Sequence, residues 1–108
     1  LIEEFSLEET IDFYANFKNL TIGKKDLIQT LDFQKSKHKQ IKFFSSGMKQ
    51  KLKLGLALFS DVKVLFLDEP TSNLDDSNTN WYLAHIKEAL KDKITIICSN
   101  QPIEYSFC

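Results

Sequence analysis

The chain has 108 residues, of which 43% are hydrophobic and 27% are charged, and its formal net charge is −1. These values are typical of one small globular domain, and the near-neutral charge gives no general attraction to an anionic membrane or to nucleic acid, so no nucleic-acid partner is predicted. No apolar run is long enough to cross a bilayer, no signal peptide opens the chain, and Cys98 and Cys108 lack metal-site or disulfide spacing, which fits a reducing cytoplasm.

The first part of the chain predicts two helices. Ser6 and Glu9 have the spacing of a capping box, and apolar side chains at helical spacing follow over Leu7–Phe17. A second helix is predicted over Lys24–Phe33. The next segment, Gln34–Lys42, is polar and basic, which is compatible with phosphate contact and with a solvated linker. No aromatic residues interleave its charges, and this favours the linker.

A third helix is predicted over Gly47–Phe59, with Ser45 as its N-cap. One apolar stripe is expected to be buried, formed by Leu52, Gly55, Leu56 and Phe59. Three basic side chains are expected in solvent, those of Lys49, Lys51 and Lys53.

An apolar run followed by two carboxylates forms the centre of the sequence. Val64–Leu67 predicts a strand buried on both faces, and Asp68, Glu69 and Pro70 follow it directly. Parallel α/β sheets place ligands at the carboxyl ends of their strands. One carboxylate can hold a hydrated magnesium ion while the other polarises a water molecule. A solvated acidic turn explains the same residues equally well.

The last predicted elements complete a strand–helix–strand unit. Asp75 is expected to cap a helix over Asp76–Leu90, and Ile94–Cys98 predicts a second strand, parallel to the first. Both strands are apolar throughout, so cover on both faces is expected. Two strands do not make a stable sheet. Because the chain also opens on Leu1 rather than on Met, we expect a piece of a longer protein that is sticky, oligomeric or marginally folded.

The order of three motifs closely resembles the ATP-binding subunit of ABC transporters. Phe44–Met48 stands where that family has its LSGGQ signature, Val64–Glu69 matches the Walker B strand, and Ser72–Asp75 matches the D-loop. The resemblance implies an α/β protein with a partial P-loop NTPase fold. Residues 1–44 would form the helical subdomain, and residues 45–108 the signature helix and the C-terminal part of the ATPase core.

The resemblance also implies which residues meet the cofactors, ATP and Mg²⁺. Ser45 and the backbone amides of Ser46 and Gly47 would face the γ-phosphate of a nucleotide bound by a second ATP-binding subunit, in a head-to-tail dimer. A helix N-terminus favours a phosphate there, and Gly47 allows close approach of the backbone.

The acidic residues have separate roles in this reading. Asp68 would hold magnesium through water, and Glu69 would act as general base on the attacking water. Asp75 would communicate across the dimer interface. Asn100 stands where the family has its switch histidine. An amide can donate a hydrogen bond but cannot titrate, so a positioning role in catalysis is predicted for it.

Two family motifs do not occur in the 108 residues. The phosphate-cradling Walker A loop, G-x-x-x-x-G-K-[ST], is absent, and the Gln-loop would lie just before Leu1. We therefore predict that this polypeptide alone neither binds ATP tightly nor hydrolyses it. The signature also varies, with Ser46 in place of a glycine and Met48 in place of the Gln. Backbone donors survive both changes.

The resulting expectation is an ATPase subunit that couples ATP hydrolysis to transport across a membrane. It would lie in the cytoplasm, peripheral to the inner face of that membrane, with a transmembrane transporter subunit as partner. Two alternatives remain open. One is a soluble ABC-family ATPase without a membrane partner. The other is a catalytically degenerate module. Asn100 suggests this alternative, and the retained Glu69 argues against it.

Overall fold

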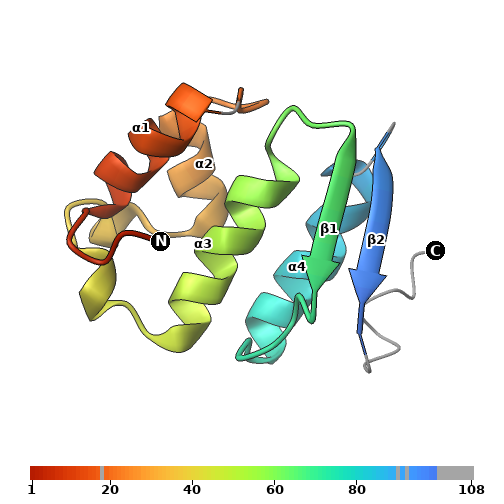
Figure 1. The fold of residues 1–108 in the computed structure, drawn as a ribbon. Coiled ribbons are helices and arrows are strands. Elements are labelled where there is room, and N and C mark those ends of the chain that lie inside the picture. Colours follow the sequence, from red (N-terminus) through yellow and green to blue (C-terminus); the bar gives the residue numbers. More distant parts are fainter. Residues whose placement is uncertain (18, 90, 92, 100–108) are drawn as a thin grey trace.

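The computed structural model describes residues 1–17, 19–89, 91 and 93–99 of the chain. Helices α1 and α2 pack on one side of the longer helix α3, while strands β1 and β2 lie on its other side with α4 behind them (Figure 1). The elements in chain order are α1 Leu7–Phe17, α2 Lys24–Leu31, the 3₁₀ turns η1 Gln34–Ser36 and η2 Ile41–Phe43, α3 Ser46–Leu58, β1 Val64–Asp68, α4 Asp76–Ala89 and β2 Ile94–Cys98.

The N-terminal helices begin where their caps predict. The Ser6 backbone N–H donates to Glu9 Oε1 at 2.9 Å, and the Glu9 N–H donates to Ser6 Oγ at 3.2 Å, so the capping box is confirmed. Helix α2 ends two residues earlier than predicted because Asp32 adopts a left-handed conformation with φ 61°. The backbone N–H of Asp32 then closes the helix on the carbonyls of its last turn.

The basic segment after α2 is more ordered than a simple linker. It forms η1 and η2, and between them Ser6 and Gln40 make an antiparallel bridge. Ile41 is fully buried, which corrects the prediction of a wholly solvated segment. The side chain of His38 is 78% exposed, and its Nδ1 lies 3.0 Å from Glu8 Oε1.

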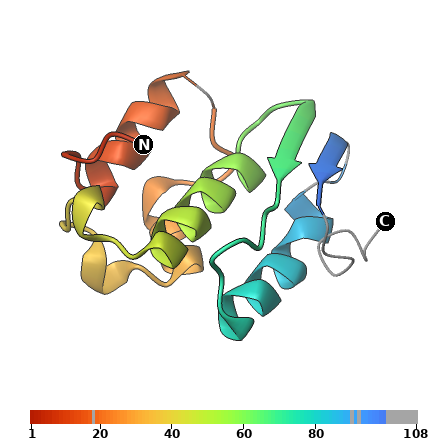
Figure 2. The same cartoon turned by 60° about the horizontal axis from the view of Figure 1, so that its bottom comes forward.

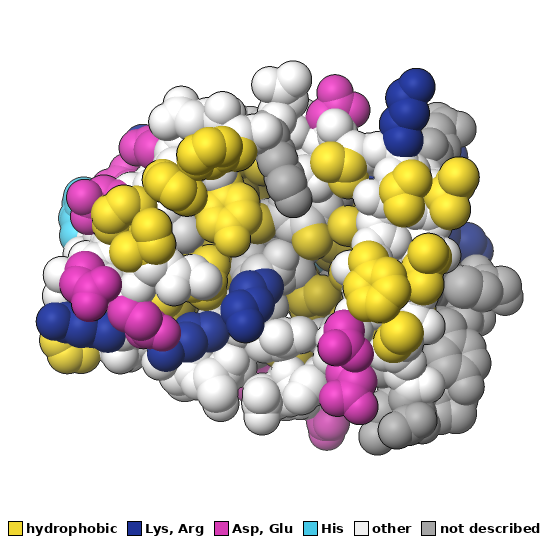
Figure 3. All heavy atoms as spheres, viewed as in Figure 1, with side chains coloured by type: hydrophobic (Ala, Val, Ile, Leu, Met, Phe, Trp, Pro, Cys, Tyr) yellow, Lys and Arg dark blue, Asp and Glu magenta, His cyan; other side chains and the backbone are white. Residues whose placement is uncertain are grey.

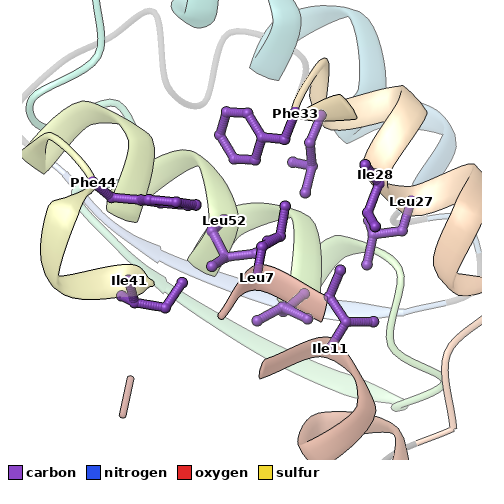
Figure 4. Close-up of a cluster of buried hydrophobic side chains, with 10 residues drawn as sticks. Leu7, Ile11, Leu27, Ile28, Phe33, Ile41, Phe44 and Leu52 are labelled. Carbon is purple, nitrogen blue, oxygen red and sulfur yellow. The ribbon is translucent and has the colours of Figure 1, made fainter. Parts of the chain in front are cut away.

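Helix α3 is buried on two sides. Leu52 and Leu56 join the apolar side chains of α1 and α2 in one cluster (Figure 4), whereas Leu54 and Leu58 pack with β1 and α4 in another. The prediction of a single buried stripe on this helix did not include the second side. Side chains of α3 contribute to both clusters. The predicted division into residues 1–44 and 45–108 stays a prediction.

One predicted surface residue of α3 is buried. Lys51 is only 6% exposed, so the expectation that it lies in solvent is wrong. It lies on α3 between the two hydrophobic clusters, where the rings of Phe33 and Trp81 cover it.

The two strands are parallel neighbours, as predicted, and α4 connects them. Their register pairs Val64 with Ile94 and continues to Asp68 with Cys98. The inward side chains of β1 are buried against α3 and α4. The outward side chains are 48–67% exposed (Figure 3); they are Val64, Phe66, Ile94 and Ile96. The described residues of one copy therefore do not supply the cover that both faces need, as the expectation of a sticky piece implies. The cause is that α4 covers only one face of this sheet in the described part of the chain.

The helices are short. None within the described ranges has the length and hydropathy needed to cross a bilayer.

Helix α4 holds the sheet through Ile86, which is fully buried. We expect Ile86→Ala to lower the free energy of unfolding by about 2–5 kcal/mol, because the truncation removes apolar contacts and leaves a cavity. Urea denaturation followed by circular dichroism measures this. Lys87→Ala, at the exposed next position of the same helix, is the matched control. An equal and small effect of both changes would contradict the packing described for α4.

Candidate functional site

The start of α3 is open to solvent. Ser45 is its N-cap, with φ −66° and ψ 162°, and Ser45 Oγ accepts a hydrogen bond from the Met48 N–H at 3.1 Å. The predicted cap is therefore confirmed. Ser45 and Ser46 are both exposed. The first N–H groups of a helix have no intrahelical acceptors, so this end offers donors and partial positive charge to an anion.

Two contacts fix the start of α3 against the loop between β1 and α4. A Cβ atom built on Gly47 would lie 2.8 Å from the backbone oxygen of Asn73, so any side chain at position 47 forces the loop to move. The Gln50 side chain adds a hydrogen bond from Nε2 to the Pro70 carbonyl at 3.0 Å. These contacts make the helix start and the loop one unit.

The acidic loop has a defined backbone. Asp68 ends β1, and the following N–H, that of Glu69, donates to the Cys98 carbonyl at 2.7 Å. Glu69 and Asn73 have positive φ angles of 43° and 65°. Asn tolerates this conformation, whereas for Glu it stores backbone strain, a feature that clusters at functional sites. Both carboxylates, Asp68 and Glu69, are exposed.

Asp75 closes the loop by capping α4. Its Oδ1 accepts a hydrogen bond from the Asn78 N–H at 2.8 Å, as the sequence predicted for a cap at this position. Its negative charge also acts on Lys51. Burial lowers the pKa of Lys51, and the carboxylates of Asp32 and Asp75 partly offset that effect.

A hollow of about 370 Å³ opens beside Asp68, between α3 and β1. Gln50 and Pro70, which join the helix to the loop, also line it, and Lys53 adds a positive charge. Gln50 directly follows the signature and Asn73 lies within the predicted D-loop, but the sequence predicted no separate site role for either residue.

The structure thus brings most of the predicted site residues to one end of the molecule. The carboxyl ends of β1 and β2 and the starts of α3 and α4 all lie there (Figures 1 and 2). These elements carry Ser45, Ser46, Gly47, Asp68, Glu69 and Asp75. Asn100 lies outside the described residues.

The acidic residues do not form a closed metal site by themselves. Within the described ranges, no group of three or more His, Cys, Asp or Glu side chains could hold a metal ion. One carboxylate at a strand end fits Mg²⁺ when water and nucleotide phosphates supply the other ligands, because this ion keeps several waters and binds few protein groups. Asp68 offers that single carboxylate.

Comparison with known proteins identifies the family. The family model described as "ABC transporter" matches residues 2–72. The chain belongs to the ABC transporter family. Rat phospholipid-transporting ATPase ABCA3 is 40% identical over 80 residues, which cover 69% of this chain and 5% of that protein. Rat ATP-binding cassette sub-family A member 17 is 35% identical over 105 residues, covering 93% of this chain and 6% of that protein.

Solved structures agree on the fold of this ABC chain. An ATP-binding subunit of an ABC transporter superimposes with a TM-score of 0.80 at 21% identity, covering all of this chain and 48% of that one. The predicted α/β class with a partial P-loop NTPase fold is therefore confirmed. The chain spans about half of that subunit and about a twentieth of the two rat relatives.

Proposed function

We propose that this chain is part of an ATP-binding and ATP-hydrolysing subunit that couples hydrolysis to transport across a membrane. The observation that carries the proposal is the contact between the start of α3 and the acidic loop. Gly47 lies against Asn73, and Gln50 donates a hydrogen bond to the Pro70 carbonyl, so the signature lies directly against the loop that follows the Asp68–Glu69 pair. A surface of helix N–H donors beside two carboxylates suits phosphoryl transfer to water.

The two adjacent carboxylates divide the chemistry. Asp68 would hold a hydrated Mg²⁺, which neutralises charge on the phosphates of ATP when bound. Glu69 would accept a proton from the attacking water. Its backbone N–H bond to Cys98 fixes the base relative to the end of β2, and its exposed side chain is free to reach a substrate. Asn100 would orient the phosphate or the water without titrating.

The start of α3 would act on a nucleotide held by a second ATP-binding subunit, in a head-to-tail dimer. Ser45 Oγ and the N–H groups of Ser46 and Gly47 are the proposed donors to its γ-phosphate. The exposure of Ser45 and Ser46 supports this, because a buried helix start could not meet another subunit. Asp75 would lie at the same interface and transmit the state of one site to the other.

A transmembrane subunit or domain is the proposed second partner, with this chain at the cytoplasmic face of the membrane. Residues 1–44 would dock it. The transporter reading is favoured over a soluble ABC ATPase because the matching family model is described as "ABC transporter" and the rat relative at 40% identity is named a phospholipid-transporting ATPase. Since that relative is a phospholipid-transporting ATPase, phospholipid is the substrate class to test first.

The full-length protein that carries these residues tests the proposal directly. We expect it to be recovered from detergent-solubilised membranes, either bound to a hydrophobic partner subunit or through a hydrophobic domain of its own. We also expect it to release phosphate from Mg²⁺-ATP. A protein that hydrolyses ATP but stays in the soluble fraction would support the soluble alternative. A membrane-bound protein with no hydrolysis would support the degenerate alternative.

The 108-residue chain alone should bind ATP weakly. Its sequence holds no Walker A loop, so nothing in it supplies the ring of backbone N–H groups and the Lys that grip the phosphates. Calorimetric titration with Mg²⁺-ATP should therefore show no binding at micromolar concentration. The full-length protein is the positive control. Micromolar affinity of the short chain would refute the division of the ATP site proposed above.

A further inference from the structure

One residue near the start of the chain, Glu3, contacts the chain on both sides of the signature. Its backbone carbonyl accepts the N–H of Lys42 at 2.9 Å, two residues before the signature, Phe44–Met48. Its carboxylate accepts a hydrogen bond from Lys49 Nζ at 3.0 Å, directly after the signature. The signature is therefore bracketed by two bonds to a single residue that lies far from it in the sequence.

The backbone around Glu3 is hydrogen-bonded to the residues that precede the signature. The Ile41 N–H donates to the Phe5 carbonyl at 2.8 Å. The Gln40 side chain donates from Nε2 to the Glu4 carbonyl at 2.9 Å. The carboxylate of Glu3 thus extends from a segment whose backbone already has partners on the other side of the helical layer.

Lys49 carries this contact into the first turn of α3. Its backbone N–H donates to the Ser45 carbonyl at 3.0 Å, and the Met48 N–H donates to Ser45 Oγ at 3.1 Å. The Lys49 side chain therefore joins Glu3 to the turn that holds the Ser45 cap. A positive charge near a helix N-terminus is unfavourable, and the Glu3 carboxylate offsets it.

The pair acts on local position more than on global stability. The side chains of Lys49 and Glu3 are 31% and 46% exposed. Ion pairs with this much exposure contribute little to the free energy of unfolding. The contact can still decide where the first turn of α3 lies, because Glu3 is bound to the chain before that turn as well as to Lys49 within it.

We propose that Glu3 is a positioning residue for the signature, which it holds through its carbonyl on one side and through Lys49 on the other. Loss of the carboxylate would let the first turn of α3 shift relative to Lys42. The donors of that turn would then meet a γ-phosphate less well. The effect on turnover rests on the proposed function. The contact itself can be tested without activity.

Amide hydrogen exchange of the full-length protein without nucleotide tests the contact. Glu3→Gln keeps the backbone bond to Lys42 and the size of the side chain, but it removes the negative charge. We expect the Met48 and Lys49 amides to exchange about twofold to fivefold faster, the range that an exposed ion pair supports.

Glu4→Gln is the matched control for the exchange measurement. Glu4 is the neighbouring carboxylate, is exposed, and takes part in no ion pair within the described ranges. Its substitution should leave the exchange of the Met48 and Lys49 amides unchanged. Exchange at the parent rate in Glu3→Gln, or the same acceleration in both variants, would overturn the proposal.

Turnover of the full-length protein supplies the functional test. We expect Glu3→Gln to lower kcat for ATP about threefold while Kd for Mg²⁺-ATP changes by less than about 1.5-fold, because the signature meets a nucleotide that the opposite subunit already holds. In a Lys49→Met background, the same substitution should change kcat by less than about 1.5-fold, because the partner of the carboxylate is gone.

Two results of the turnover test would overturn the positioning role. One is an unchanged kcat in Glu3→Gln. The other is an equal loss of kcat from Glu3→Gln with and without Lys49→Met, because Glu3 would then act independently of Lys49. Absence of hydrolysis in the unmutated protein would count against the proposed function instead, and the exchange measurement would still decide the role of Glu3.

Discussion

Glu69→Gln is expected to reduce ATP hydrolysis by the full-length protein by about 10²–10⁴-fold, the usual contribution of a general base. The amide has the shape of the carboxylate but cannot accept the proton of the attacking water. Affinity for Mg²⁺-ATP should stay within about threefold of the parent value, because Asp68 and the phosphate donors are unchanged. Phosphate release and nucleotide binding measure the two effects separately.

Glu88→Gln is the matched control for this substitution. Glu88 is also a glutamate on the surface, with a side chain 81% exposed, but it lies near the far end of α4 from the acidic loop. It should leave hydrolysis unchanged. Equal rates for the Glu69→Gln variant and the parent would remove Glu69 from the mechanism and favour a base outside this chain.

Gly47→Ala is the second substitution with a large expected effect. The new Cβ would stand 2.8 Å from the Asn73 oxygen, a backbone atom that can move only if the whole loop moves. We expect a loss of about 1–3 kcal/mol in the free energy of unfolding from overpacking. Hydrolysis by the full-length protein should fall about 10²-fold, because a displacement of about 1 Å misaligns the reacting groups.

Gly23→Ala separates this effect from the general consequences of losing a glycine. A Cβ at position 23 meets nothing within 4 Å, so hydrolysis should be unchanged. Because Gly23 is the N-cap of α2, where Ala is less favourable than Gly, we expect a loss of at most about 1 kcal/mol in the free energy of unfolding. If Gly47→Ala lowered hydrolysis no more than Gly23→Ala does, the start of α3 and the acidic loop would not form the tight unit described above.

The elements that the sequence predicted well are those governed by local signals. The Ser6–Glu9 capping box, the Ser45 cap and the Asp75 cap each satisfy N–H groups within a few residues, and helical periodicity gave the helices they begin. The parallel pairing of β1 and β2 followed from the helix between them.

The features that the sequence did not predict depend on contacts between distant segments. Lys51 has the spacing of a surface residue, but the ring of Trp81 on α4 and the ring of Phe33, just after α2, cover it. Gly47 offers no local sign that Asn73 lies against it. Glu69 has a positive φ where its N–H bonds to the carbonyl of Cys98 on the neighbouring strand, a contact that no local pattern predicts.

The open face of the sheet also reflects long-range packing. The unbroken apolar runs predicted that both faces need cover, and Phe66 and Ile96 on the open face are 60% and 48% exposed, as expected if one copy of this chain does not supply that cover. Apolar patches of this kind mark contact surfaces. The expected self-association of the chain stays a prediction, and analytical ultracentrifugation of the parent against a Phe66→Lys variant checks it. A monomeric parent at high concentration would contradict it.

The structure of the full-length Glu69→Gln protein with Mg²⁺-ATP bound tests the central claim most directly. We expect a closed dimer in which Ser45 Oγ and the N–H groups of Ser46 and Gly47 lie about 2.7–3.2 Å from γ-phosphate oxygens of the nucleotide held by the opposite subunit. ATP bound within one subunit alone, with the start of α3 left in water, would contradict the claim.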